Sequence, residues 1–439
     1  MSASFQNSLI EKSLWVATAG DAPDLPILEG ETSCDVAIIG AGILGLSTAL
    51  HAAAQGGSVI ALDAATPGWG GGGRNGGQVN PGLKVDPEGL LSRFGPSTGG
   101  ELAQFGAATA DETFETLRKF GVECDSTQKG WLQLAHSPAA LSGLEIRARE
   151  WRALGVAMEV LSAADAHRLT GSAAYAGGIL NPKGGSLHPL KLVRGLAQAA
   201  LAQGARIFRH SRVLKIDQAR GRSGLVTAQG RVWARRVLIA TDGYTDGLFP
   251  ALERSVLPVS TFQIATEPLS GDVARSILPN GHHVSDTHRS LYYFRKDAQG
   301  RFLIGGRGSY GPQGAERAYR ELERVAAKIY PELGHGPWAY RWGGMVAVTE
   351  DHLLHVTEPA PGILAAIGCN GRGVALSVAL GRRLAEKLVT GAANSVLFPL
   401  EALRPIALHG LKKTMLPLIA ETYSVLDHLD KGSVLRRNA

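Results

Sequence analysis

Apolar and polar positions follow two patterns along this chain, and residues 35–63 contain both. Residues 35–39 read Asp-Val-Ala-Ile-Ile, a short apolar run that is typical of a buried strand. A glycine turn at 40–45 and a helix-like stretch come next, and residues 58–62 repeat the short apolar run. This order of strand, turn, helix and strand predicts a parallel βαβ unit.

The turn of this unit has the spacing of a dinucleotide-binding turn. Gly40 permits the sharp exit from the strand, Gly42 lets the backbone approach a pyrophosphate, and Gly45 lets the helix pack on the strand. Asp63 ends the second strand about 20 residues later, where a carboxylate accepts hydrogen bonds from ribose hydroxyls. The simpler alternative is a glycine-rich turn in a sheet protein. We expect a dinucleotide site, with Ile43 and Ala64 as further contacts.

The same two patterns continue through the rest of the chain. Apolar residues at three- or four-residue spacings predict helices, and short apolar or alternating runs predict strands. The predicted helices are 100–120, 141–154, 189–203, 315–329 and 374–388. The predicted strands are 131–135, 213–216, 224–227, 236–240, 256–264, 291–294, 302–305 and 363–367.

Segments that suit a nucleotide fold occur at the start, in the middle and at the end of the chain. The length of 439 residues also favours two domains over one. We therefore predict an α/β fold with a discontinuous Rossmann-like domain and a β-rich α+β substrate domain. The first takes residues 31–90, 160–247 and 338–400, and the second takes 91–159 and 248–337. Residues 1–30 form a lead-in, and 401–439 form a tail that we expect to close over the nucleotide domain rather than dock a partner.

Composition narrows the class of protein. Hydrophobic residues make up 44% of the chain and charged residues 19%, as in ordinary globular proteins. The net charge of +6 is scattered, so we expect no nucleic-acid partner. Cys34, Cys124 and Cys369 lack the spacing of a zinc site or a disulfide framework, and no other spacing suggests a metal. The N-terminus lacks a secretory signal and the apolar run 36–50 is too short for a transmembrane segment, so we expect a cytoplasmic protein.

Four further motifs accompany the glycine turn. They are Gly-Arg-Asn-Gly-Gly-Gln at 73–78, Gly-Gly-Ser-Leu-His-Pro at 184–189, Tyr-Arg-Trp-Gly-Gly at 340–344 and Gly-Cys-Asn-Gly-Arg-Gly at 368–373. Together, over residues 14–430, they resemble the glycine/D-amino-acid oxidase family of FAD-dependent amine oxidoreductases. Within that family the resemblance is strongest to the gamma-glutamylputrescine oxidoreductase branch. The second glycine loop and the C-terminal return to the nucleotide fold favour FAD over a nicotinamide cofactor.

The resemblance implies which residues contact FAD. The loop formed by Gly73, Arg74, Asn75, Gly76, Gly77 and Gln78 would lie along the flavin, with Arg74 supplying positive charge. The alternative is a flexible surface loop. Val213 would read the adenine through its backbone, unless it is an ordinary core residue. The remaining expected contacts are Thr241, Gly243, Trp342, Gly343, Gly368, Asn370, Gly371, Arg372 and Gly373. The family's C-terminal attachment cysteine has no counterpart at 343–346, so we expect non-covalent FAD.

Candidates for substrate positioning come from the strand-rich region and from the last glycine loop. Tyr293 and Arg295 share one face of a predicted strand, where tyrosine would bound an amine pocket and arginine would pair with a carboxylate. An ordinary sheet face with a solvated arginine is the alternative. Arg372 is expected on a flavin oxygen or a substrate carboxylate, with a surface arginine as the alternative. His188 matches a family position and is either a positioning residue or a helix cap.

The expected reaction is oxidation of the C–N bond of an amine or of a secondary or N-substituted amino acid. A hydride passes to flavin N5, and the imine product is hydrolysed. The resemblance implies gamma-glutamylputrescine-, pipecolate- or sarcosine-type substrates. Residues 302–305 lack the lysine that sarcosine oxidases place over the flavin, so O₂ or another electron acceptor stays open. A D-amino-acid dehydrogenase, a nicotinamide-dependent dehydrogenase and a non-catalytic FAD-binding subunit are the alternatives, and the oligomeric state is open.

Overall fold

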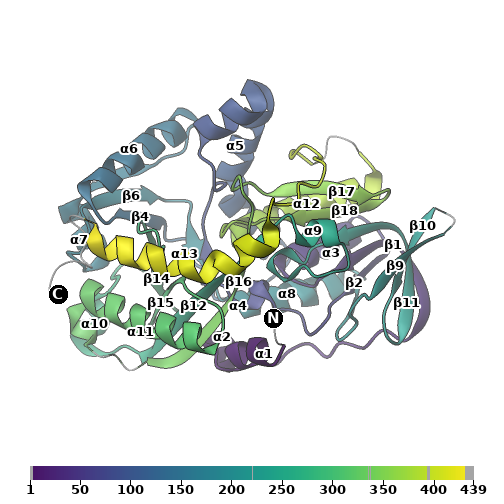
Figure 1. Cartoon of the computed structure of the whole chain (residues 1–439), viewed down its shortest axis with the longest axis horizontal. Coiled ribbons are helices and arrows are strands. Elements are labelled where there is room, and N and C mark those ends of the chain that lie inside the picture. Colours follow the sequence, from purple (N-terminus) through teal and green to yellow (C-terminus); the bar gives the residue numbers. More distant parts are fainter. Residues whose placement is uncertain (1–2, 220, 335, 337, 393–395, 431–439) are drawn as a thin grey trace.

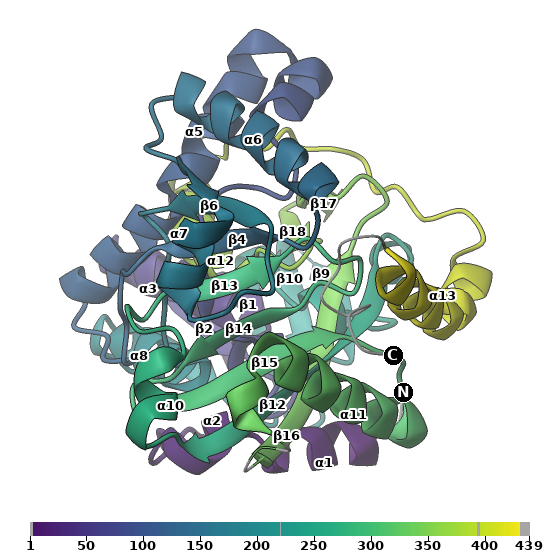
Figure 2. The same ribbon diagram turned by 90° about the vertical axis from the view of Figure 1, so that its left-hand side faces the viewer.

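Two β-sheets, each with eight described strands, form the centre of the molecule, and helices cover their faces (Figure 1). This computed structural model describes residues 3–430 except 220, 335, 337 and 393–395. Figure 1 places the first sheet on the right and the second on the left, and Figure 2 shows the same elements turned by 90°. Among the described residues, no helix is both long and apolar enough to cross a membrane.

The first sheet contains the predicted βαβ unit. Its strand order is β17-β18-β11-β1-β2-β8, and β10 and β9 extend from β11. β1 runs parallel to both β2 and β11, with Ile38 beside Ala61 and Leu238. The bounds are β1 Gly30–Ile39, β2 Val59–Leu62, β8 Arg206–Phe208, β9 Lys215–Ala219, β10 Arg222–Val226, β11 Gly230–Ile239, β17 His355–Ala360 and β18 Ile363–Ile367. The carboxyl ends of β1, β2 and β11 therefore meet at one edge of the sheet, where α/β proteins bind their ligands.

Four helices share a continuous apolar core with this sheet. They are α3 Ile43–Ala54, α5 Pro87–Lys119, α8 Pro189–Ala202 and α12 Gly373–Thr390. α3 and α12 approach closely because Gly381 has no side chain, and the Ser47 hydroxyl donates to the Val378 carbonyl at 2.8 Å. A Cβ atom at Gly381 would lie 2.4 Å from the Ser47 oxygen. The N-terminal and C-terminal parts of the chain thus form one nucleotide-type layer, as predicted.

The second sheet has the strand order β16-β12-β15-β14-β13-β4-β6-β5. Its bounds are β4 Trp131–Ala135, β5 Glu159–Ser162, β6 Gly177–Asn181, β12 Leu257–Pro268, β13 His283–Asp286, β14 Tyr293–Lys296, β15 Arg301–Arg307 and β16 Trp338–Val348. Segments 160–247 and 338–400 were assigned to the nucleotide domain, but β5, β6 and β16 pair in this second sheet. An apolar run reveals a strand but not its partner, and β16 pairs with β12 along most of its length. The domain limits themselves stay a prediction.

The other helices flank the second sheet or connect the two layers. They are α1 Ala3–Glu11, α2 Leu14–Thr18, α4 Gly71–Arg74, α6 Pro138–Ala153, α7 Ala163–Thr170, α9 Pro250–Glu253, α10 Gly271–Ser276, α11 Pro312–Ile329 and α13 His409–Leu429, with short 3-10 turns η1 Asp242–Tyr244 and η2 Pro331–Leu333. A two-stranded ribbon, β3 Gln78–Val79 and β7 Gly185–Ser186, joins the Gly-Arg-Asn-Gly-Gly-Gln and Gly-Gly-Ser-Leu-His-Pro motifs. Two motifs about 100 residues apart are therefore adjacent in the fold.

Candidate functional site

One large cavity of about 910 Å³ extends from the carboxyl edge of the first sheet to the second sheet. Most of the residues that the sequence singles out line it, although they come from widely separated segments. They are Gly40, Gly42, Ile43, Asp63, Ala64, Arg74, Asn75, Gly76, Gln78, Val213, Thr241, Gly243, Tyr293, Asn370, Gly371, Arg372 and Gly373. The structure thus brings the dinucleotide turn, the second glycine loop and the C-terminal glycine loop to a single space.

The glycine turn between β1 and α3 is shaped for an anion. Gly40 has φ +100°, and a Cβ at Gly45 would lie 2.0 Å from the Gly40 carbonyl oxygen, so neither position accepts a side chain without strain. Gly42 is different, because a Cβ there would meet no protein atom within 4 Å and would project into open space. Gly42 caps α3 without a side-chain hydrogen bond, so the first N–H groups of the helix remain available at the cavity. A phosphate would satisfy these groups.

The acid at the end of β2 lies next to this turn. Its Oδ2 accepts from the Ala41 N–H and its Oδ1 from the Ala65 N–H, both at 2.8 Å. Asp63 is thereby fixed at the cavity wall, and its remaining lone pairs can accept ribose hydroxyls. Val213 precedes β9 rather than lying in it, and its N–H forms no hydrogen bond with the described residues. Asp63 and Val213 therefore offer one acceptor and one donor to the nucleoside end of a dinucleotide.

The second glycine loop is held by its own side chains. Asn75 donates through Nδ2 to the Gly72 carbonyl at 2.8 Å and accepts through Oδ1 from the Gly77 N–H at 2.9 Å. Arg74 is buried and donates to the carbonyls of Trp69, at 2.6 Å, and Gly343, at 3.2 Å. Its Nη2 is buried without a hydrogen-bond partner among the described residues. Arg74 therefore organises the loop, and its positive charge lies close to the cavity wall.

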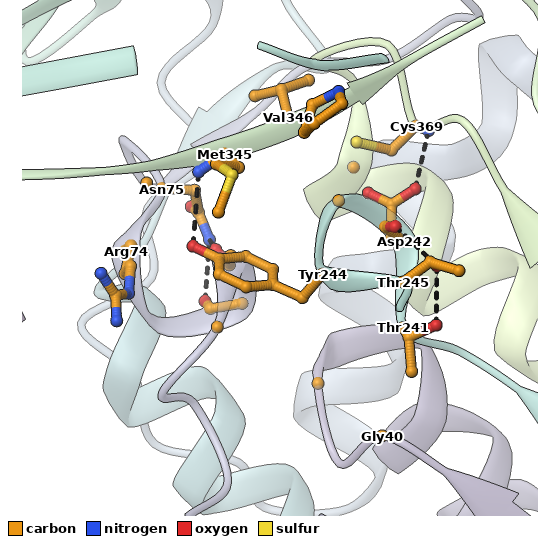
Figure 3. A pocket seen from close by; sticks show the side chains of 18 of the residues that line it. Gly40, Arg74, Asn75, Thr241, Asp242, Tyr244, Thr245, Met345, Val346 and Cys369 are labelled. Carbon is orange, nitrogen blue, oxygen red and sulfur yellow. Dashed lines mark hydrogen bonds between the residues drawn. The ribbon is translucent and has the colours of Figure 1, made fainter. Parts of the chain in front are cut away.

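A buried carboxylate links the middle and the end of the chain, and the sequence analysis missed it. The Asp242 Oδ1 accepts from the N–H groups of Gly368, at 2.9 Å, and Cys369, at 3.2 Å (Figure 3). Burial raises the pKa of Asp242, while these hydrogen bonds lower it. Burial and the neighbouring Asp242 raise the pKa of Cys369 well above its ordinary value, which suits a loop residue and not a nucleophile. Asp242 has a positive φ of +42°, a backbone feature that the sequence does not show.

Eight expected site residues do not line the cavity. They are Gly45, Gly73, Gly77, His188, Arg295, Trp342, Gly343 and Gly368. The glycines among them allow close backbone packing; a Cβ at Gly73, for example, would lie 2.1 Å from the Gly68 carbonyl oxygen. Trp342 is fully buried, and its Nε1 donates to the Arg74 carbonyl at 2.9 Å. These residues support the wall of the cavity from behind.

Arg295 is the clearest correction. The sequence placed it beside Tyr293 as a carboxylate-binding residue, but its Nε donates to the Gly76 carbonyl and its Nη2 to the Leu187 carbonyl, both at 2.7 Å. Burial lowers its pKa to about 10. Its guanidinium also lies 5.2 Å from the centre of the Trp15 ring. Arg295 therefore joins the two paired motifs from outside the cavity, because carbonyl oxygens and an aromatic face already satisfy it.

His188 is a helix cap, which was the alternative in the sequence analysis. Its Nδ1 accepts from the Lys191 N–H at 3.2 Å at the start of α8, and its Nε2 lies 3.0 Å from the Thr18 hydroxyl. Burial, with a further effect of Lys191, lowers the pKa of His188 to about 3. The ring is therefore neutral at ordinary pH and does not face the cavity.

The second-sheet end of the cavity has a distinct set of residues. The Arg372 guanidinium lies 4.4 Å from the centre of the Trp131 ring and donates to the Pro81 carbonyl at 3.2 Å. Burial lowers the pKa of Arg372 to about 9. Tyr293 lines the wall beside Gly76, and burial raises its pKa. Sequence reasoning missed the further lining residues Asn80, Lys84, Gln133 and Arg307, which no local motif marks.

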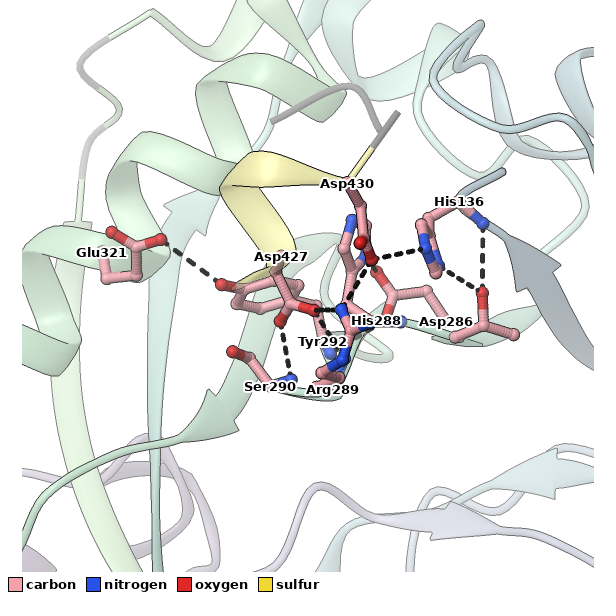
Figure 4. Close-up of polar contacts among 10 residues, drawn as sticks. His136, Asp286, His288, Arg289, Ser290, Tyr292, Glu321, Asp427 and Asp430 are labelled. Atoms are coloured by element: carbon pink, nitrogen blue, oxygen red, sulfur yellow. Dashed lines mark hydrogen bonds and ion pairs between the residues drawn. The ribbon is translucent and has the colours of Figure 1, made fainter. Parts of the chain in front are cut away.

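The helix of the C-terminal tail begins at the nucleotide end of the cavity, where His409 Nε2 lies 2.9 Å from the Val256 carbonyl oxygen and Lys413 Nζ lies 3.6 Å from the Glu253 carboxylate. His409 and Lys413 of α13 line the wall, and Asp427 anchors the other end of the helix. The Asp427 carboxylate accepts from the N–H groups of Arg289, at 2.9 Å, and Ser290, at 2.8 Å (Figure 4). We expected the tail to close over the nucleotide domain. The start of α13 contacts Val256 and Glu253 on that side, whereas these donors after β13 fix its C-terminal half on the second sheet.

Three comparisons with known proteins agree with this geometry. The sequence profile of the family described as "FAD dependent oxidoreductase" (DAO) matches residues 35–387. The chain is 32% identical to gamma-glutamylputrescine oxidoreductase of Escherichia coli K12 over 378 residues, which cover 86% of this chain and 88% of that protein. It is also 32% identical to the probable oxidoreductase OrdL of Haemophilus influenzae, over 81% of this chain and 83% of the relative.

A solved structure has the same fold. Glycine oxidase of Geobacillus kaustophilus superposes with a TM-score of 0.70 at 22% identity, and the match covers 84% of this chain and all of that one. The uncapped start of α3, the acid at 63 and the unpaired Arg74 Nη2 suit the cofactor in the family's description. The chain therefore belongs to the DAO family of FAD-dependent oxidoreductases.

Proposed function

We propose that this protein oxidises the C–N bond of an amine or a secondary or N-substituted amino acid that carries a carboxylate, using non-covalently bound FAD. The observation that carries the proposal is the continuity of the cavity, which joins the dinucleotide turn to Arg372. Bound flavin supplies a hydride acceptor at N5 for the carbon next to the nitrogen, and water hydrolyses the resulting imine. The name of the 32% identical relative supports an amine substrate.

The protein's own residues position the substrate. Arg372, stacked on Trp131, presents a charged donor that suits a carboxylate, and Tyr293 lines the same cavity. Among the described residues of the second-sheet end, no carboxylate lines the cavity, so an ammonium group finds no counter-ion there. The site consequently favours the neutral amine, whose nitrogen lone pair is free to assist hydride departure.

The electron acceptor is the second part of the proposal. β15 carries Phe302, Leu303 and Ile304 where sarcosine oxidase-like members of the family place a lysine. This favours a dehydrogenase that uses an acceptor other than O₂. A D-amino-acid dehydrogenase of the same kind is the competing activity, and a non-catalytic FAD-binding subunit is the competing role.

The test is an anaerobic absorbance titration of the purified protein, followed by admission of air. Flavin bleaching by gamma-glutamyl amines, pipecolate or sarcosine is the expected result, with slow recovery of the absorbance in air. Replacing Arg372 by Gln should weaken the binding of a carboxylate-bearing substrate about tenfold or more. The control Arg382→Gln, on the exposed side of α12, should leave this binding unchanged. A yellow protein that no amine bleaches would contradict the proposed activity.

A further inference from the structure

Three cationic side chains converge on the second-sheet end of the cavity. Lys84 comes from the loop before α5, Arg307 from the end of β15, and Arg372 from the loop before α12. The acidic residues that line the cavity are Asp63, Asp242, Asp246 and Glu253, and all of them belong to the nucleotide end. A wall with three positive charges and no negative one is costly unless a ligand supplies the negative charge.

Lys84 is the least satisfied of the three. It forms no hydrogen bond or ion pair with the described residues, although it lines the cavity. The nearby acid, Asp86, is not available, because Arg147 binds it through Nε, at 2.8 Å, and through Nη2, also at 2.8 Å. Burial, and next Arg372, Arg307 and Arg147, lower the pKa of Lys84 to about 7, whereas Asp86 raises it. The imidazole of His352 also faces Lys84 and Arg307.

Arg307 and Arg372 likewise bond to carbonyl oxygens instead of carboxylates. Arg307 donates to the Arg289 carbonyl at 3.4 Å. Of the groups whose charge acts on Arg307, Tyr423 is a phenol, and Asp427 is taken up by the Arg289 side chain and two backbone N–H groups. Arg372 donates to the Pro81 carbonyl. Both guanidinium groups therefore keep donors that could bind an anion.

A neutral donor completes this wall. Arg147 Nη1 donates to Gln133 Oε1 at 2.7 Å, which fixes the orientation of the amide because a guanidinium is only a donor. The Gln133 NH₂ group then points away from Arg147 and forms no hydrogen bond with the described residues, and Gln133 lines the cavity. The second-sheet end thus combines three cations with an oriented amide donor.

We infer that the substrate is a secondary amine with two carboxylate groups and no second amino group, held by Arg372 on one carboxylate and by Lys84 and Arg307 on the other. This inference rests on the proposed function and narrows its substrate class. A substrate with one carboxylate leaves part of the positive charge unbalanced, and a second ammonium group adds repulsion. The same charges keep the reacting nitrogen neutral, as hydride transfer requires.

The test uses two ether analogues in which oxygen replaces the reacting nitrogen, so that neither can be oxidised there. Oxydiacetate carries two carboxylates and methoxyacetate carries one. Binding to the FAD-loaded protein is followed by the change in flavin absorbance. Oxydiacetate should bind about tenfold or more tightly than methoxyacetate. Equal affinities, or tighter binding of putrescine than of oxydiacetate, would overturn the inference.

Variants identify the residues responsible. Lys84→Met and Arg307→Gln should each weaken the binding of oxydiacetate about tenfold more than the binding of methoxyacetate. The exposed control Lys129→Met should change neither affinity. FAD content is measured for each variant. If Lys84→Met loses FAD and keeps the ligand preference, Lys84 serves the cofactor and the inference is wrong. Equal weakening of both analogues in both variants also refutes it.

The companion measurement is an anaerobic titration with iminodiacetate and sarcosine, which differ by the second carboxylate. Bleaching by iminodiacetate at about tenfold lower concentration supports the substrate class. If the ether analogues show the expected preference but no amine bleaches the flavin, the proposed function fails while the charge preference of the cavity stands. If sarcosine and iminodiacetate bleach the flavin equally well, the proposed function stands and the inference fails.

Discussion

Gly45 and Gly42 lie three residues apart in the dinucleotide turn, yet their replacement by Ala should have opposite consequences. A Cβ at Gly45 would lie 2.0 Å from the Gly40 carbonyl oxygen and 3.1 Å from Ile38 Cγ2. One of these atoms belongs to the backbone and the other to a buried side chain of β1, so the added methyl group would force α3 away from β1. Overpacking against backbone costs about 3 kcal/mol, and the gain in helix propensity from Gly to Ala returns about 1 kcal/mol. The expected net loss for Gly45→Ala is about 2 kcal/mol in the FAD-free protein.

The Cβ atom added by Gly42→Ala meets no protein atom within 4 Å. The free energy of unfolding of the FAD-free protein should therefore change by no more than about 0.5 kcal/mol. The new methyl group instead occupies the space where a phosphate approaches the start of α3. Loss of one charge-assisted hydrogen bond costs about 3 kcal/mol, which corresponds to about 100-fold weaker FAD binding.

Urea unfolding of the FAD-free protein and titration with FAD by flavin fluorescence separate the two effects. Gly143→Ala on the open side of α6 is the matched control, because its Cβ also meets nothing within 4 Å and lies far from the cavity lining. Normal FAD affinity in Gly42→Ala, or a Gly45→Ala protein as stable as the wild type, would refute the reasoning.

Three other changes test the corrected roles and the charged end of the cavity. Arg295→Lys should lose the paired hydrogen bonds to the Gly76 and Leu187 carbonyls and lower stability by about 2 kcal/mol, without a specific rise in the KM for a carboxylate substrate. His188→Ala should cost about 1 kcal/mol in urea unfolding and His188→Asn less, with an unchanged pH profile of kcat, because the neutral ring only caps α8. Burial lowers the pKa of Lys84 to about 7, so its positive charge is present below that pH and lost above it. The Kd of oxydiacetate should therefore rise as the pH increases through this range. The Lys84→Met variant should show a smaller rise. An unchanged slope in Lys84→Met assigns the effect to another group.

The position of β16 shows how far a local pattern leads. Residues 338–348 form a strand that pairs with β12 of the second sheet, Leu257–Pro268. No pattern within the segment specifies that partner, because pairing is decided by which sheet edge is free and by which side chains fit it. We predicted no strand at 338–348 and placed this segment in the nucleotide domain, whereas it forms β16 and pairs with β12 of the second sheet.

The polar residues of the site also fall into those that a local motif marks and those whose role depends on distant contacts. Gly40, Gly42 and Asp63 could be found because a turn, a helix start and a strand end act on neighbouring residues, and the required spacing is written in the chain. Arg295 looked suitable for a substrate carboxylate and proved to bind two backbone carbonyls instead. Lys84 carried no motif and proved to be an unpaired cation in the cavity.

The sequence by itself determined the βαβ unit, the cofactor class and the motif residues Gly40, Gly42 and Asp63 at the nucleotide end, because each depends on short-range geometry and on motifs with fixed spacing. Tertiary structure alone decided which strands share a sheet, that Asp242 ties the turn after β11 to the loop before α12, and that Lys84, Arg307 and Arg372 meet. The physical reason is that burial and charge compensation depend on contacts between distant segments, and these contacts exist only after the chain has folded.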